Sequence, residues 1–77
     1  MSITVRYFAS LKERVGCSQH KLDISTELSV HDAWQHLNPT LVMPDNVLAA
    51  INQEYVDLAT LLKDGDELAF FPPVTGG

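Results

Sequence analysis

The clearest constraint on the fold is one amphipathic helix in a chain of only 77 residues. Its apolar residues recur at helical spacing at Val30, Ala33, Trp34 and Leu37. Ser29 and Asp32 have the spacing of an N-cap and the acid three residues later. We expect the helix to stop at Asn38, because a residue before proline avoids the helical region. We expect Trp34 to be the largest single anchor of the core.

Short segments with strand character lie on both sides of this helix. Alternation of apolar and polar residues predicts strands at 3–8 and 20–24. A continuous apolar run predicts a buried strand at 47–51, with a turn at 52–54, a return strand at 55–56 and a last strand at 68–71. Because strands outnumber helices, the sequence predicts an α+β fold in which one main helix covers a sheet.

Three further local structures are expected between these elements. Ser10 and Glu13 have the spacing of a capping box, which predicts a short helix at 11–15 with Ser10 as its N-cap and Gly16 at its end. Residues 60–63 are expected to form one helical turn, and Asp64-Gly65-Asp66 a tight turn. A chain of this length is expected to be a single domain over residues 1–77.

The charge is negative and unevenly distributed. Ten acids and five bases give a net charge of −5, all of it in residues 39–77, which hold six acids and one base. This balance argues against nucleic acid and against an anionic membrane surface as partners. Asp64, Asp66 and Glu67 are candidates for contact with a basic partner surface. The alternative is a solvated acidic surface.

The single cysteine, Cys17, cannot form an internal disulfide, which fits a reducing compartment. No secretory signal and no membrane-spanning run are visible, so we expect a cytoplasmic protein. Cys17 and His20 have C-x-x-H spacing, but no second ligand pair follows, so we expect an inert thiol and no metal site.

The last residues carry the strongest chemical signal. They read Phe71-Pro72-Pro73-Val74-Thr75-Gly76-Gly77, and no ionisable side chain occurs from residue 68 onward. Two prolines stiffen the segment, which lowers the entropy lost when it docks. Glycine has no Cβ and can pass through a narrow channel to a reacting centre. The alternative is an ordinary frayed terminus, for which this pattern would not be needed.

With this ending, the chain resembles the small subunits of molybdopterin synthase, the MoaD family of ubiquitin-like sulfur carriers. The resemblance covers nearly the whole chain. It rests on residues 5–16, 52–56, 62–68 and, most specifically, 71–77. Two positions depart from the family pattern: Lys12 stands where arginine is frequent, and Thr75 where serine is common. Neither residue bears the terminal carboxylate.

The resemblance implies a β-grasp, ubiquitin-like fold and a carrier that is no enzyme on its own. A ubiquitin-activating-type adenylyltransferase would use ATP and magnesium to adenylate the Gly77 carboxylate. A sulfur donor such as a cysteine desulfurase would convert it to a thiocarboxylate. The large synthase subunit would then transfer the sulfur to a pyranopterin precursor in molybdenum cofactor biosynthesis. The family's synthase is a heterotetramer with two small subunits, and no permanently bound cofactor is implied.

The resemblance also assigns roles in the tail, residues 72–77, and in the residue before it. Gly77 would carry the sulfur, and Gly76 would keep the inserted end thin. The remaining residues would guide and seat the tail: Thr75, Val74, Pro73, Pro72 and Phe71. Four alternatives stay open: a sulfur carrier for thiamine synthesis, a ubiquitin-like protein modifier, a ubiquitin-like interaction module without acyl chemistry, and a small enzyme using Cys17 or the histidines.

Overall fold

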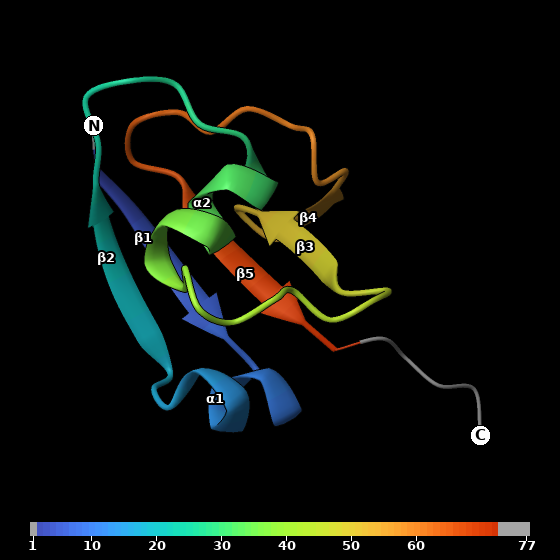
Figure 1. Cartoon of the computed structure of the whole chain (residues 1–77). Helices are drawn as coiled ribbons and strands as arrows, with labels where there is room; N and C mark the ends of the chain where they lie inside the picture. The colour runs from blue at the N-terminus through green and yellow to red at the C-terminus, as the bar shows by residue number, and fades with distance from the viewer. Residues whose placement is uncertain (1, 73–77) are drawn as a thin grey trace.

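The computed structural model describes residues 2–72, which form a five-stranded sheet with a helix packed across one face (Figure 1). In chain order the elements are β1 (Ser2–Tyr7), α1 (Ser10–Val15), β2 (Gln19–Asp23), α2 (Val30–Leu37), β3 (Leu48–Ile51), β4 (Glu54–Val56) and β5 (Glu67–Phe71). The strand order is β2-β1-β5-β3-β4. β1 and β5 run parallel, and the other neighbours are antiparallel.

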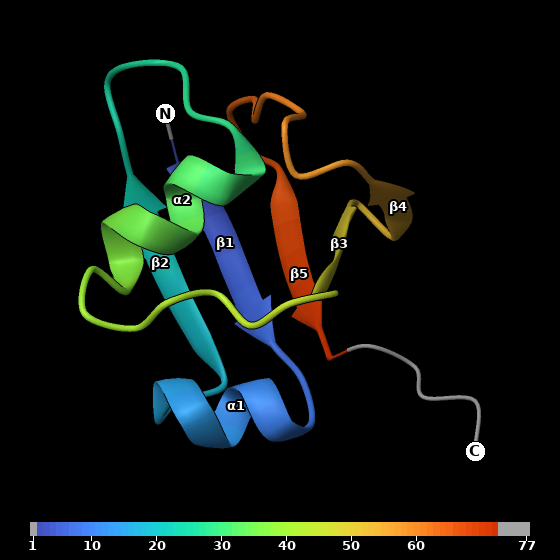
Figure 2. The ribbon, with the colours of Figure 1, turned by 45° about the vertical axis from the view of Figure 1, so that its right-hand side comes forward.

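α2 lies across one face of the sheet (Figure 2). The buried core residues lie between this helix and that face. Alternate residues of the two central strands face this core, because successive side chains of a strand point to opposite faces. The inward set of these two strands is completely or almost completely buried: Ile3, Val5 and Tyr7 of β1, and Leu68 and Phe70 of β5. The predicted α+β class is confirmed, and the arrangement is that of the expected β-grasp fold.

Trp34 anchors this core, as the sequence predicts. Its side chain is fully buried and meets the ring of Phe70 edge-to-face, with centroids 5.1 Å apart. The indole N–H would be costly to bury without a partner, and it donates to the carbonyl of Leu41 at 2.9 Å. This bond also ties the loop that follows α2 to the helix.

The end of α1 is as predicted, but its start is not. Gly16 follows α1 with φ 93°, a left-handed conformation that glycine adopts without strain. The residue before the helix is Ala9, with φ 52° and ψ −129°, and no side chain caps the helix. The prediction that Ser10 is the N-cap is therefore wrong. The chain turns directly after Phe8, so Ser10 already lies inside the helix.

α2 begins as its sequence predicts. The Ser29 hydroxyl accepts a hydrogen bond from the backbone N–H of Asp32 at 3.1 Å. In contrast, the helical turn predicted at 60–63 is absent from the described fold. Leu61 instead forms a bridge with Ser29, and the Leu62 N–H donates to the Leu28 carbonyl at 2.9 Å. Pairing with the segment before α2 replaces local helical bonds there.

The strands lie within one or two residues of their predicted positions, and their turns depend on residues with positive φ. Asn52 and Gln53 connect β3 to β4 with φ 51° and 74°. Two consecutive positive φ angles are typical of a two-residue type I′ hairpin. Gly65 has φ 84° in the predicted turn before β5. Neither described helix is long and apolar enough to cross a membrane.

Candidate functional site

The end of β5 positions the candidate carrier tail. Phe71 is the last residue of β5 and pairs with Leu48 of β3, and Pro72 follows at once. β5 also pairs with β1 on its other side, so neighbours on both sides fix the point where the tail leaves the sheet. The other predicted tail residues lie outside the described residues: Pro73, Val74, Thr75, Gly76 and Gly77.

Four apolar side chains gather around this exit on the face of the sheet opposite α2, and we call them the aromatic patch: Phe8, Leu48, Tyr55 and Phe71. Phe70 faces the core, so Phe71 faces away from it. The rings of Phe8 and Phe71 are stacked with centroids 4.8 Å apart and planes 8° apart. Tyr55 meets Phe71 at 6.1 Å between centroids. The patch therefore joins β1, β3, β4 and β5 at the base of the tail.

The aromatic patch is open to solvent and uncharged. Tyr55 is 71% exposed, Phe8 39% and Leu48 37%. A hollow of about 460 Å³ between β3 and β4 continues from the patch and shares Leu48 and Tyr55 with it. Clustered exposed aromatic side chains at a sheet face are typical of protein interaction sites. The aromatic patch is therefore a candidate docking surface for another protein.

Sequence reasoning found Phe71 but missed Phe8, Leu48 and Tyr55. These residues come from three separate strands or strand ends, so no local motif contains them. The alternation of β1 could have indicated one of them. Phe8 follows Thr4 and Arg6 at the positions that point away from the core, where an aromatic residue is unexpected.

The three acidic candidates lie at the other end of β5, and two of them have structural roles. Oδ1 of Asp64 accepts a hydrogen bond from the Ser2 backbone N–H at 2.8 Å. Oδ2 of Asp66 accepts from the Lys63 N–H at 2.8 Å and so closes the turn. Glu67 lies 3.8 Å from the guanidinium of Arg6, with both side chains about half exposed. Contact of these acids with a partner stays a prediction.

Cys17 and His20 are held in a chain of hydrogen bonds. Sγ of Cys17 lies 3.3 Å from Nε2 of His20, and Nδ1 of His20 lies 3.0 Å from the Tyr7 hydroxyl. That hydroxyl also accepts from the side-chain amide of Asn38 at 3.2 Å. Burial raises the pKa of Tyr7, so it stays a neutral phenol. Both imidazole nitrogens are thus engaged in linking β1, β2 and the end of α2.

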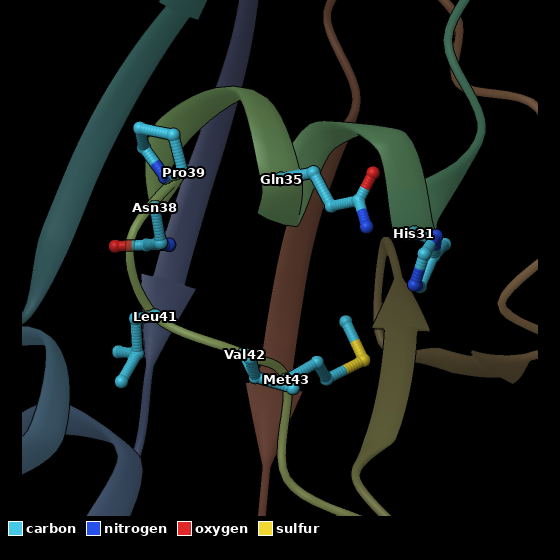
Figure 3. Close-up of a pocket in the computed structure, with 7 residues that line it drawn as sticks. All are labelled: His31, Gln35, Asn38, Pro39, Leu41, Val42 and Met43. Carbon is cyan, nitrogen blue, oxygen red and sulfur yellow. The ribbon is translucent and has the colours of Figure 1, made fainter.

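No group of three or more His, Cys, Asp or Glu side chains that could hold a metal ion occurs among residues 2–72. Another hollow, of about 460 Å³, lies between α2 and the loop that follows it (Figure 3). His31 and Gln35 line it from the helix, and Met43 lines it from the loop. None of the residues lining it belongs to the aromatic patch or carries a carboxylate.

Comparison with known proteins identifies the family. The sequence model of the ThiS family matches residues 5–77. The chain belongs to the ThiS family. Within this family it is 44% identical to the molybdopterin synthase sulfur carrier subunit of Escherichia coli K12, over 97% of this chain and 99% of that protein. The resemblance to the molybdopterin synthase small subunits is thereby confirmed.

Solved structures agree with this ThiS-family assignment. The small archaeal modifier protein SAMP1 of Haloferax volcanii matches with a TM-score of 0.80 and 30% identity over 100% of both chains. A protein of Helicobacter pylori, solved as a complex of subunits 1 and 2 of molybdopterin-converting factor, matches with a TM-score of 0.64 and 28% identity over 100% of both chains. These ubiquitin-like neighbours confirm the β-grasp fold.

Proposed function

We propose that this chain is the sulfur carrier subunit of a molybdopterin synthase and that it carries sulfur as a thiocarboxylate on Gly77. The observation that carries the proposal is an uncharged Gly-Gly tail leaving β5 beside the aromatic patch, in a chain 44% identical to such a subunit of E. coli. In this function the chain is a carrier, and the chemistry takes place in the pockets of its partner enzymes.

The terminal carboxylate must first be activated, because a carboxylate is a poor acyl donor. Its oxygen attacks the α-phosphorus of ATP-magnesium in an adenylyltransferase of the ubiquitin-activating type, which forms an acyl-adenylate and releases pyrophosphate. Sulfur from a persulfide donor, such as a cysteine desulfurase, then attacks the acyl carbon and displaces AMP. The product is an acyl disulfide between Gly77 and the donor cysteine. A thiol reductant, taken up as a second substrate, cleaves this S–S bond by exchange and leaves with the donor's sulfur as a disulfide, so the outer sulfur remains on Gly77 as a thiocarboxylate.

The sulfur-loaded tail then enters the large synthase subunit, where the sulfur passes to a pyranopterin precursor. Phe71 and Pro72 aim the tail, while Val74, Thr75 and Gly76 fit a narrow channel without placing a side-chain charge in it. The aromatic patch docks on the large subunit around the mouth of that channel. The product needs two sulfurs, in keeping with a heterotetramer with two small subunits. We place this assembly in the cytoplasm.

Sulfur loading is tested by intact-mass measurement. The full chain is incubated with ATP, magnesium, the activating enzyme and a sulfur donor, and a chain lacking Gly77 is treated in parallel. We expect a mass increase equal to replacement of one oxygen by sulfur in the full chain alone. An unchanged mass under conditions that load an established carrier contradicts the proposal.

Docking is tested separately by changes in the aromatic patch. We expect Tyr55→Ser to weaken binding to the large subunit by about tenfold or more, because exposed aromatic anchors dominate such interfaces. Leu61→Ser is the matched control, since Leu61 is also exposed, at 52%, but lies outside the patch. Equal binding by the two variants would place the interface elsewhere.

A second candidate function is favoured by the match to SAMP1, a small archaeal modifier protein. In that case the activated Gly77 would be attached to lysine amines of other proteins. The same loading reaction without a sulfur donor distinguishes the two functions. A modifier gives covalent conjugates of higher mass in a cell extract, whereas a dedicated carrier gives none.

A further inference from the structure

The turn between β1 and α1 contains a strained residue next to the aromatic patch. Ala9 has φ 52° and ψ −129°, close to the first central position of a type II′ turn, where glycine is usual. The Leu11 N–H donates to the Phe8 carbonyl at 3.1 Å, which closes the turn around Ala9. A non-glycine residue in such a conformation is strained and persists only where the surroundings enforce it.

Phe8, the residue before Ala9, forms hydrogen bonds through both its backbone N–H and its carbonyl. The Phe8 N–H donates to the Phe70 carbonyl at 3.2 Å and so extends the pairing of β1 with β5 by one residue. Its carbonyl accepts the bond that closes the turn. Phe8 is therefore the last residue fixed to the sheet before the chain reverses, and its ring stacks on Phe71 at the base of the tail.

The methyl group of Ala9 restricts this turn in a way that glycine would not. Glycine populates positive and negative φ about equally, so it would relieve the strain and also let the turn change conformation. Ala9 reaches fewer conformations, and within the folded protein the sheet and α1 hold it in this one. Strained residues of this kind cluster where a binding surface is pre-organised.

We propose that Ala9 is a positioning residue of the docking surface: its restricted, strained turn keeps the Phe8 ring stacked on Phe71 before a partner arrives. The inference rests on the proposed docking of the aromatic patch on the large synthase subunit. Holding one ring in its bound orientation removes roughly 0.5–1.5 kcal/mol of ordering cost from binding, which corresponds to about 2- to 12-fold in affinity. The natural chain is therefore less stable than a chain with glycine at position 9 would be, because glycine adopts this turn without strain.

Two replacements separate rigidity from strain. Ala9→Gly removes both the strain and the restriction. Replacing Ala9 with D-alanine, in a chemically synthesised chain, removes the strain but keeps a methyl group that favours positive φ. Gln53→Gly is the matched control, because Gln53 also has positive φ, 74°, but lies in the β3–β4 turn.

We expect all three replacements to raise the thermal midpoint, and only Ala9→Gly to weaken binding to the large subunit, by about 2- to 12-fold. The D-alanine chain should bind at least as tightly as the natural one. Equal affinity of the Ala9→Gly and natural chains overturns the inference, and so does an equal loss with D-alanine.

A readout without the partner keeps this inference separate from the proposed function. Proton NMR of the isolated chain reports the contact between the Phe8 and Phe71 rings through ring-current shifts and cross-ring Overhauser effects. We expect these signals to weaken in Ala9→Gly and to persist in the D-alanine and Gln53→Gly chains. Unchanged ring signals in Ala9→Gly contradict the role of Ala9, whether or not the chain binds a synthase.

Discussion

The side-chain amide of Asn52 donates to Oδ1 of Asp66 at 3.0 Å and so joins the β3–β4 turn to the turn that precedes β5. Oδ1 of the same Asn52 side chain accepts a hydrogen bond from the backbone N–H of Glu67 at 3.0 Å. These bonds fix the start of the strand whose other end carries the tail. Asp66, which the charge pattern suggests for partner contact, therefore also stabilises the fold. The same holds for Asp64, which accepts a hydrogen bond from the Ser2 N–H.

The carboxylate of Asp66 accepts two hydrogen bonds in the turn before β5. We expect Asp66→Ala to lower the free energy of unfolding by about 1–3 kcal/mol, because the Lys63 N–H and the Asn52 amide both lose their acceptor. Urea unfolding followed by tryptophan fluorescence measures the change. Asp45→Ala removes an exposed acid elsewhere and serves as the control. Equal stability of both variants would show that the side chain of Asp66 adds nothing to the turn.

Glu67 tests the acidic surface with little disturbance of the fold. Its ion pair with Arg6 is half exposed and stabilises little, so Glu67→Lys should fold normally. If a basic partner surface meets this region, the association rate should fall most at low salt and recover as salt is raised. Stopped-flow association over a range of salt concentrations is the measurement. Rates that match the natural chain at every salt concentration remove Glu67 from the interface.

Because the Tyr7 hydroxyl is buried, we expect the folded protein to lose stability at alkaline pH. Burial raises the pKa of Tyr7 above its ordinary value of 10.0, so the folded protein retains a proton that the unfolded chain releases. The free energy of unfolding should therefore fall as pH rises from about 10 toward the folded-state pKa. The slope should be smaller in Tyr7→Phe, and an unchanged slope in that variant would contradict the role of Tyr7. Denaturant unfolding at a series of alkaline pH values measures these slopes.

Deletion of Gly77 should separate chemistry from stability. We expect the shortened chain to lose sulfur delivery to the pyranopterin precursor, because the reacting carboxylate no longer reaches its position in the partner. The thermal midpoint should stay nearly unchanged, since the described core is built from residues 3–70. Scanning calorimetry and a synthase assay are run on the same preparation. Sulfur delivery at the natural rate would refute the role of Gly77.

Local patterns predicted the elements whose stability is mainly local. The segment Val30–Leu37 has helical spacing and a serine cap, and it forms α2 as expected. The failures occur where tertiary pairing overrides local preference. Leu61 pairs with Ser29 in place of a helical turn, and the sharp reversal after Phe8 draws Ser10 into α1.

The candidate site was predictable only in part, for the same reason. The tail is continuous in sequence, so its composition and order are visible directly. The aromatic patch is not, because Phe8, Tyr55 and Phe71 become neighbours only when β5 inserts between β1 and β3. The strain at Ala9 could not be predicted either, because it lies in the backbone conformation and alanine is not a residue typical of positive φ.

The central place of β5 also affects how the protein is made. β1, near the start of the chain, can complete its pairing only when β5, near the end, has left the ribosome. A nascent or truncated chain that lacks β5 has no joined sheet and no assembled aromatic patch. A partner that recognises the aromatic patch would therefore bind only chains in which β5 is present and paired.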